Sequence, residues 1–160
     1  MSMQKFLSNQ ITSPLRQIAR GRLARPCDVF INHRGVDTKK TVAGLLHHRL
    51  SHLNIHSFLD SKSMQPGDKL YESIGSAISK CKVGVVVFSP HYCDSYFCLH
   101  ELALLVDMKK KLIPIFYDVK PSELQIMAYD KSTLKELVRF RKALEEARYT
   151  VGLVFDSQNG

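Results

Sequence analysis

The chain of 160 residues and 18.2 kDa has the size of one domain. Its hydrophobic fraction of 44% and charged fraction of 24% match those of average soluble globular domains, which excludes a fibrous or generally disordered chain. No apolar run approaches the roughly 18 residues of a membrane-spanning helix. The four cysteines show no metal-ligand spacing and follow no secretory segment, so we expect free thiols, no metal and a cytoplasmic location.

The net charge of +8 is concentrated at the N-terminus. Residues 1–27 carry one lysine, four arginines and no acid, which leaves only +3 for the rest of the chain. A nearly balanced body argues against nucleic acid as the main partner. We interpret residues 1–26 as a disordered basic arm, although the same composition also fits an organelle transit peptide.

From Cys27 onward, short apolar runs alternate with longer segments of helical period, a pattern typical of an α/β domain with a parallel sheet. The run at 83–88 (VGVVVF) is the most apolar, so we expect it at the centre of the sheet, covered on both faces. The predicted strands are 27–31, 55–59, 83–88, 112–117 and 151–155.

The segments between the predicted strands have the period of amphipathic helices. We expect Asp37 to cap the first helix, and Asp94 or Ser95 to cap the third. Leu45, Leu70, Leu134 and Val138 are among the apolar residues expected to face inward. The predicted helices are 38–53, 70–81, 94–110 and 132–148. This alternation fits a flavodoxin-like, five-stranded parallel sheet of order 2-1-3-4-5, with helices on both faces.

In such a sheet, ligands bind outside the carboxyl ends of the strands where the strand order reverses, here between the first and third strands. The loop after the first strand contains Arg34 and Gly35 and enters a helix, whose N-terminal N–H groups can bind an anion. The loop matches neither the Walker pattern nor the dinucleotide glycine fingerprint. Spacing alone is therefore equally compatible with a solvated surface loop.

The third predicted helix brings a carboxylate to the same edge. Phe97 and Glu101 are four residues apart and share a helix face, with the Ser95 hydroxyl nearby. A carboxylate beside an aromatic ring and a hydroxyl can hold a ribose. From the residues alone, the simpler interpretation is favoured: Glu101 is a surface residue near a helix start, and Phe97 belongs to the core.

Several motifs together carry a more specific resemblance. In order and spacing they resemble the plant class of Toll/interleukin-1 receptor (TIR) domains, over about residues 27–155. The segments are 28–38 (DVFINHRGVDT), 58–60 with 64–68, 85–89 (VVVFS), 98–102 (CLHEL) and 113–122 (IPIFYDVKPS). We expect a TIR domain over 27–157 and a tail at 158–160, and the chain resembles the TIR-only members of the class.

The resemblance implies an activity. Many plant TIR domains cleave NAD at the nicotinamide–ribose bond and make ADP-ribose products, some cyclic, that act as immune signals. It implies an NAD(P)+ glycohydrolase or ADP-ribosyl cyclase that self-associates, uses NAD+ or NADP+ as substrate, and needs no cofactor. By motif, the catalytic residue is Glu101, and the substrate-contacting residues are Arg34, Gly35, Ser95, Phe97 and the loop residues Pro66, Gly67 and Asp68.

Two departures from the family pattern keep other functions open. Phe97 stands where the family usually has Trp, and Gly44-Leu45 stands where many members have Ser-His at a self-association surface. The first alternative is therefore a catalytically weak adaptor that binds itself or other TIR proteins in defence signalling. The net charge of +8 keeps a second alternative open, a nucleic-acid binder with nuclease-like activity that uses the basic arm.

Overall fold

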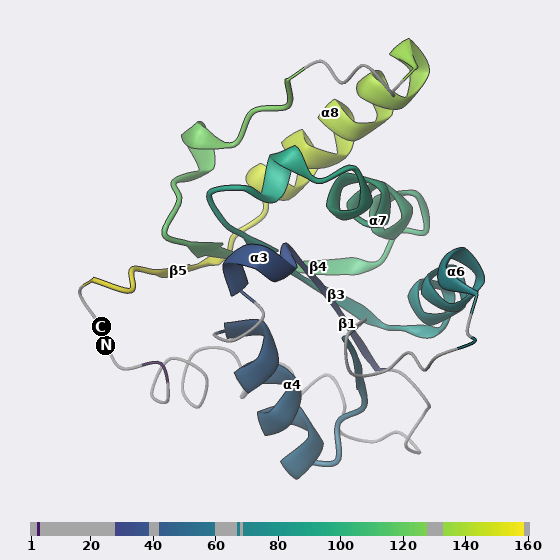
Figure 1. The fold of residues 1–160 in the computed structure, drawn as a ribbon, viewed down its shortest axis with the longest axis vertical. Helices are drawn as coiled ribbons and strands as arrows, with labels where there is room; N and C mark the ends of the chain where they lie inside the picture. Colours follow the sequence, from purple (N-terminus) through teal and green to yellow (C-terminus); the bar gives the residue numbers. More distant parts are fainter. Residues whose placement is uncertain are drawn as a thin grey trace.

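The computed structural model describes residue 3 and residues 28–38, 42–59, 67, 69–127 and 133–158. Five parallel strands form one sheet of order β2-β1-β3-β4-β5, which confirms the predicted fold class (Figure 1). The strands are β1 (Val29–His33), β2 (Ser57–Phe58), β3 (Val83–Phe88), β4 (Lys111–Tyr117) and β5 (Leu153–Phe155). The apolar run at 83–88 is β3, fully buried between β1 and β4 as expected.

The helices follow the predicted segments, with one correction. The first predicted helix, 38–53, overlaps the longer helix α4; its first residue, Thr38, ends the one-turn helix α3, and residues 39–41 lie outside the described residues. Asp37 lies inside α3 and bonds to another loop, so the expectation that it caps a helix is wrong. The helices are α3 (Gly35–Thr38), α4 (Val42–His52), α6 (Leu70–Lys80), α7 (Tyr96–Asp107) and α8 (Leu134–Arg148), with 3-10 turns η2 (Tyr92–Asp94) and η3 (Pro121–Glu123).

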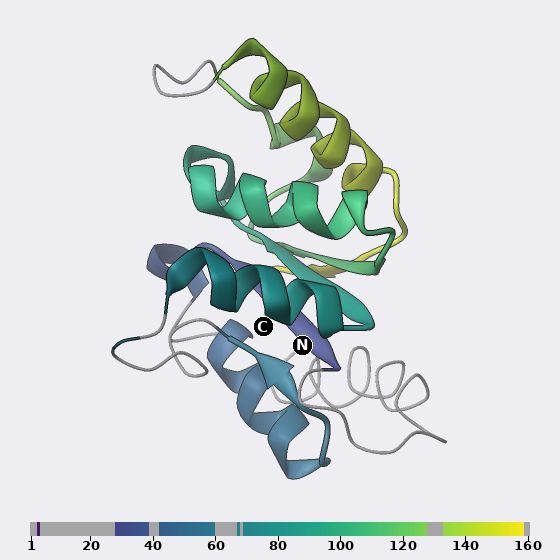
Figure 2. The same cartoon turned by 90° about the vertical axis from the view of Figure 1, so that its right-hand side faces the viewer.

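Side-chain alternation along the strands divides the core into two layers. The odd-numbered β3 residues Val83, Val85 and Val87 pack with α4, whereas Val86 and Phe88 pack with α6, α7 and α8. Figure 1 shows α4 on one side of the sheet and the other three long helices on the opposite side. Figure 2 shows α7 between α6 and α8, in agreement with the contacts of α7 with both. The central strand is therefore covered on both faces.

Four apolar residues expected to face inward are exposed instead: Leu45, Leu70, Leu134 and Val138. Leu70 and Leu134 are the first residues of α6 and α8. In α4, burial follows Val42, Leu46 and Leu50, and this four-residue spacing leaves Leu45 outside the contact with the sheet. Among the described residues, no helix combines the length and apolarity needed to cross a membrane.

Candidate active site

A pocket of about 260 Å³ opens at the carboxyl end of β1, beside the start of α7, at the point where the strand order reverses. Five of the predicted site residues line this pocket, and three elements supply its wall. The lining residues are His33, Arg34 and Gly35 at the end of β1 and just after it, Leu70 and Ile74 from α6, and Ser95, Phe97, Cys98 and Glu101 at α7. The structure therefore brings the predicted carboxylate, ring, hydroxyl and arginine to one cavity.

The predicted loop at 66–68 does not join this pocket among the described residues. Gly67 is absent from the pocket lining, and its φ of 99° lies in the left-handed region that favours glycine. Pro66 and Asp68 lie outside the described residues. The role expected for this loop therefore stays a prediction.

Glu101 is nearly buried although it is a charged residue, with only 8% of its surface exposed. A carboxylate in such a position requires hydrogen-bond donors. The Asn32 side chain supplies one: its Nδ2 donates to Glu101 Oε2 at 3.2 Å. Glu101 is therefore not the solvated helix residue that the simpler interpretation of the sequence favoured.

Asn32 is part of a wider buried network. Its Nδ2 also donates to the carbonyl oxygen of Cys98 at 3.2 Å, and its Oδ1 accepts from the Tyr92 hydroxyl. The Tyr92 hydroxyl also lies 3.2 Å from the Cys98 carbonyl oxygen. Burial, with smaller effects from Cys98, Glu101 and Cys93, raises the pKa of Tyr92 well above its usual value. Tyr92 therefore remains a neutral hydroxyl near neutral pH.

Ser95 has a structural task at the pocket. Its Oγ accepts a hydrogen bond from the backbone N–H of Cys98 at 3.2 Å, which caps α7 and confirms one of the two predicted caps. A serine hydroxyl that accepts in this way keeps its own hydrogen to donate. Ser95 can therefore fix the start of α7 and still offer a donor to a ligand.

Phe97 forms an aromatic surface with two neighbours. Its side chain is 44% exposed, and its ring centroid lies 6.0 Å from that of Tyr71 on α6 and 6.0 Å from that of Tyr96. The expectation that Phe97 belongs to the core is therefore wrong: its ring is partly exposed at the pocket. Tyr71 enlarges the aromatic area available for stacking beside the pocket.

Asp37 ties the two loops that carry the pocket residues. Its Oδ2 accepts from the Ser89 hydroxyl at 2.6 Å and from the His91 backbone N–H at 2.8 Å, and His91 Nδ1 lies 2.8 Å from its Oδ1. Burial raises the pKa of Asp37, but these bonds outweigh it and the net pKa is lowered. The loop with Arg34 is thereby fastened to the loop that leads into α7.

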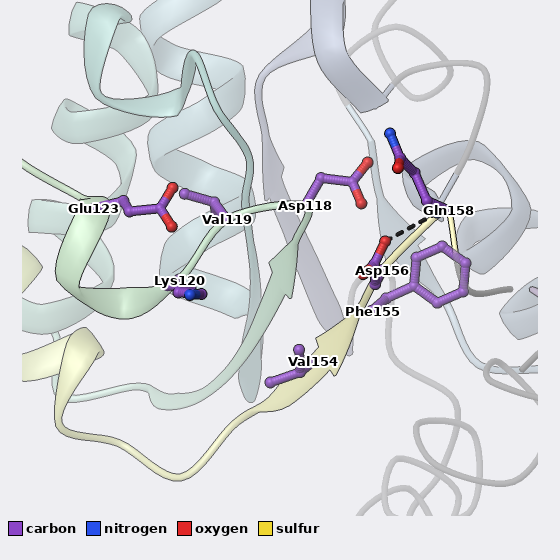
Figure 3. A pocket seen from close by; sticks show the side chains of 8 residues that line it. All are labelled: Asp118, Val119, Lys120, Glu123, Val154, Phe155, Asp156 and Gln158. Carbon is purple, nitrogen blue, oxygen red and sulfur yellow. Dashed lines mark hydrogen bonds between the residues drawn. The ribbon is translucent and has the colours of Figure 1, made fainter.

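A larger cavity of about 430 Å³ lies at the carboxyl ends of β4 and β5 (Figure 3). Two of its three acidic residues are already engaged: Asp118 accepts from the backbone N–H and hydroxyl of Ser157, and Asp156 accepts from the backbone N–H of Gln158. These bonds stabilise the turn after β5. The third carboxylate, Glu123, is exposed, unlike the nearly buried Glu101, so the smaller pocket is the candidate active site.

Cysteine and metal chemistry receive no support from the described part of the chain. Burial raises the pKa of the Cys81 and Cys93 thiols to about 11 each, which makes both poor nucleophiles near neutral pH. Across the described ranges, no group of three or more His, Cys, Asp or Glu side chains is arranged to hold a metal ion.

Sequence reasoning did not select several residues of the site. His33 and Cys98 line the pocket directly beside predicted residues, so adjacency was a usable signal. Tyr71 and Ile74 come from a helix whose position beside α7 only the fold reveals. Asn32 is the first residue of the predicted loop, but nothing in the sequence indicates its contact with Glu101, 69 positions away.

Fold and site together define a class: a flavodoxin-like α/β domain with a nearly buried carboxylate in a pocket at the sheet's switch point. Residues 27–159 match the family model described as "TIR domain". The chain belongs to the TIR domain family.

Two curated relatives are similar to this chain in sequence. It is 56% identical over 137 residues to "Probable 2' cyclic ADP-D-ribose synthase BdTIR" of Brachypodium distachyon, a match that covers 83% of this chain and 61% of the relative. It is 34% identical over 136 residues to "TMV resistance protein N" of Nicotiana glutinosa, covering 75% of this chain and 12% of that protein. The chain thus spans about three fifths of the first relative's length and a small part of the second's.

Solved structures agree with the fold. The TIR domains in the structure of the activated Roq1 resistosome, which directly recognizes the pathogen effector XopQ, match with a TM-score of 0.71 and 32% identity, over 83% of this chain and 89% of that one. The TIR domain of the Toll-related receptor TRR-2 from Hydra magnipapillata matches with a TM-score of 0.51 and 22% identity, over 76% and 98% of the two chains. The second likeness concerns the fold alone.

Proposed function

We propose that this protein cleaves NAD+, or NADP+, at the bond between nicotinamide and ribose and releases linear or cyclic ADP-ribose products. The observation that carries the proposal is Glu101, a nearly buried carboxylate that lines the pocket together with Ser95 and Phe97. The name of the Brachypodium relative, a probable cyclic ADP-ribose synthase, supports the same chemistry. As in plant TIR proteins, the products would serve defence signalling.

The reaction suits a site with one carboxylate. When the glycosidic bond breaks, its electron pair moves to the pyridine nitrogen, so nicotinamide leaves neutral and needs no general acid. Positive charge develops on the ribose carbon, and the Glu101 carboxylate stabilises it. Water then attacks that carbon, or a hydroxyl of the same ADP-ribose does so to close a ring, and the attacking oxygen loses its proton to solvent. Ordinary glycosidases use two carboxylates because their leaving groups require protonation.

The other lining residues bind and orient the substrate in this proposal. A volume of about 260 Å³ is somewhat below the usual size of pockets that enclose a whole ligand, so it fits the nicotinamide–ribose half of the dinucleotide. Phe97 offers a ring for stacking and Ser95 a hydroxyl for the ribose. Arg34, on the loop at the start of α3, carries the positive charge that suits the pyrophosphate.

The test of this function compares the purified protein with its Glu101→Ala variant. Each is incubated at high protein concentration with NAD+ and, separately, with NADP+, and nicotinamide and the nucleotide products are measured by chromatography and mass spectrometry. We expect Glu101→Ala to lower nicotinamide release at least about a hundredfold, because the preorganised charge opposite the ribose cation is lost. Equal and negligible release by both proteins refutes the proposal.

A matched control removes a carboxylate from the other cavity. Glu123 lies in η3 and lines the larger cavity near β5. Glu123→Ala is expected to release nicotinamide at the wild-type rate. A loss of activity in this variant equal to that in Glu101→Ala would point to the larger cavity instead.

The second candidate is an adaptor that acts through contacts between TIR domains, and we propose self-association for either function. The favouring observation is Leu45, a large apolar side chain that is 41% exposed on α4, next to Gly44. An exposed leucine is suited to an apolar contact with a second copy or another TIR protein. Leu45→Asp is expected to weaken self-association measured by light scattering, whereas Glu101→Ala leaves it intact. Equal association by wild type and Leu45→Asp would exclude this surface.

A further inference from the structure

Two buried residues stand behind the Glu101 carboxylate without lining the pocket. Asn32 and Tyr92 have no exposed surface, and neither belongs to the pocket wall, whereas Glu101 does. They come from β1 and η2, two elements that pack against α7, the helix of Glu101. Strand alternation directs Asn32 to the same side as Phe30, toward α7. Neither residue can touch a substrate, so any effect on the reaction must pass through Glu101.

The hydrogen bonds have a direction that follows from the chemistry of the groups. Asn32 Oδ1 can only accept, so the Tyr92 hydroxyl donates its single hydrogen to it. The Cys98 carbonyl oxygen and Glu101 Oε2 are both acceptors, and this assigns the orientation of the amide, with its Nδ2 toward them. Both Nδ2 hydrogens are then used, one on each acceptor. The amide cannot turn over without breaking three contacts.

We propose that Asn32 and Tyr92 are positioning residues for Glu101. Tyr92 orients the Asn32 amide, and the amide N–H holds Glu101 Oε2 in one place and in its ionised form. The inference rests on the proposed function, because it takes Glu101 as the catalytic carboxylate. A neutral donor suits this task, since it stabilises the carboxylate without placing a competing positive charge beside the ribose cation.

Other titratable groups surround the carboxylate, so a test by pH must leave their charges unchanged; the Tyr92 hydroxyl can be removed under this condition, because burial raises its pKa and it stays neutral. His33 and Arg34 approach from the end of β1, Tyr92 from η2, and Cys98 from α7 itself. The residues that α6 contributes to the pocket, Leu70 and Ile74, do not titrate. Replacing Asn32 removes a neutral donor and leaves all of these ionisable groups in place.

The first experiment measures steady-state kinetics of NAD+ cleavage for Tyr92→Phe and Asn32→Leu. We expect kcat to fall about tenfold in Tyr92→Phe and about a hundredfold in Asn32→Leu, with KM within about twofold of wild type, because the misplaced carboxylate acts on the transition state. The acidic limb of the kcat/KM profile moves to higher pH, because a buried carboxylate without its donor has a raised pKa.

The matched control is Tyr117→Phe. Tyr117 is also a buried tyrosine, but it stacks on Phe155 in the core on the α4 side of the sheet. We expect this variant to keep the wild-type kcat and pH profile. An equal change in Tyr92→Phe and Tyr117→Phe would mean that any buried tyrosine hydroxyl has this effect, and would overturn the inference.

The second experiment does not depend on activity. Protein labelled with ¹³C at the glutamate carboxyl carbon is titrated by NMR, and Glu101→Gln identifies the Glu101 signal. We expect the pKa of the Glu101 carboxyl to rise by about one unit in Asn32→Leu and by less, in the same direction, in Tyr92→Phe. If Asn32→Leu fails to fold, Tyr92→Phe, which removes a single oxygen atom, still decides the question.

The two experiments separate the two proposals. If wild type releases no nicotinamide but the Glu101 pKa rises in the variants, the proposed function fails and the network stands. If wild type cleaves NAD+ while Tyr92→Phe keeps the wild-type kcat, pH profile and Glu101 pKa, the network inference is overturned and the proposed function stands.

Discussion

Phe97 and Tyr71 show how the site accommodates Phe in place of the Trp that the family resemblance implies. The resemblance to plant TIR domains implies a Trp where this chain has Phe97, and Phe offers a smaller ring. In this structure the Tyr71 ring of α6 packs beside the Phe97 ring, with centroids 6.0 Å apart and an angle of 32° between the planes. Both side chains are partly exposed. The neighbouring tyrosine therefore restores part of the aromatic area that the smaller ring gives up.

We predict that the Phe97 ring contributes to the affinity for the substrate. Phe97→Ala is expected to raise KM for NAD+ about fivefold, which corresponds to about 1 kcal/mol of lost ring contact. Phe97→Trp is expected to keep or lower KM, because it adds stacking area. Steady-state kinetics with NAD+ check both variants. A KM for Phe97→Ala equal to that of wild type would show that the ring does not contact the substrate.

Among the elements, β5 depends on one glycine that precedes it. A Cβ on Gly152 would lie 2.7 Å from the carbonyl oxygen of Pro114 and 2.9 Å from the Phe116 ring. The carbonyl oxygen belongs to the backbone of β4 and cannot move aside as a side chain can. Close pairing of the short strand β5 with β4 therefore requires the absence of a side chain at this position.

We predict opposite effects of the same substitution at two glycines. Gly152→Ala is expected to lower the free energy of unfolding by about 1 to 3 kcal/mol, because the added methyl group meets backbone. Gly75→Ala is the matched control: an added Cβ meets nothing within 4 Å there, and the position lies inside α6. It is expected to raise the free energy of unfolding by about 0.5 to 1 kcal/mol. Urea unfolding measures both, and a stabilising Gly152→Ala would contradict the close approach.

The α8 helix shows that some elements are specified locally. Thr133 Oγ1 accepts from the Glu136 backbone N–H at 3.2 Å, and Glu136 Oε2 accepts from the Thr133 backbone N–H at 3.0 Å. This capping box begins the helix at Leu134, within two residues of the start that the period predicts. Glu136 also accepts from the Tyr96 hydroxyl at 2.8 Å, so the same residue links α8 to α7.

In the molecule as a whole, Asp37 links the segment after β1 to the segment after β3 by hydrogen bonds beside the pocket. It lies in α3 after β1, while its partners Ser89 and His91 follow β3, more than 50 positions away. Burial raises the pKa of Asp37, but the bonds from Ser89 and His91 lower it to a net value below the usual one. A carboxyl group with a lower pKa in the folded state stabilises the fold above its unfolded pKa, and loses this effect as pH falls through the folded pKa.

We predict the pH dependence that follows. Asp37→Asn is expected to lower the free energy of unfolding at pH 7, and the difference from wild type is expected to shrink below a pH of about 4, as the wild-type carboxylate becomes protonated. Urea unfolding at several pH values measures this. Asp107→Asn is the control, because Asp107 forms a half-exposed ion pair with Arg139 and such pairs contribute little. If the difference in free energy of unfolding between wild type and Asp37→Asn did not depend on pH, the ionised Asp37 carboxylate would not be what stabilises the fold here.

Some features of this molecule can be predicted from its sequence, and others cannot. The strand at 83–88 is predicted with its observed bounds, because a short apolar run rich in β-branched valine is typical of a strand covered on both faces. The prediction of Asp37 as a helix cap is wrong, because a one-turn helix has no period to detect and the partners of Asp37 are distant in sequence.

The sequence by itself determined the strand order, the family and the candidate residues at positions 34, 35, 95, 97 and 101, because periodicity and motif spacing are local properties of the chain. Only the tertiary structure decided that Glu101 is nearly buried, and that Asn32, Tyr92 and Tyr71 surround the site. Burial and hydrogen bonding depend on groups brought together from separate strands and helices. Folding alone sets those distances, and they decide what the carboxylate can do.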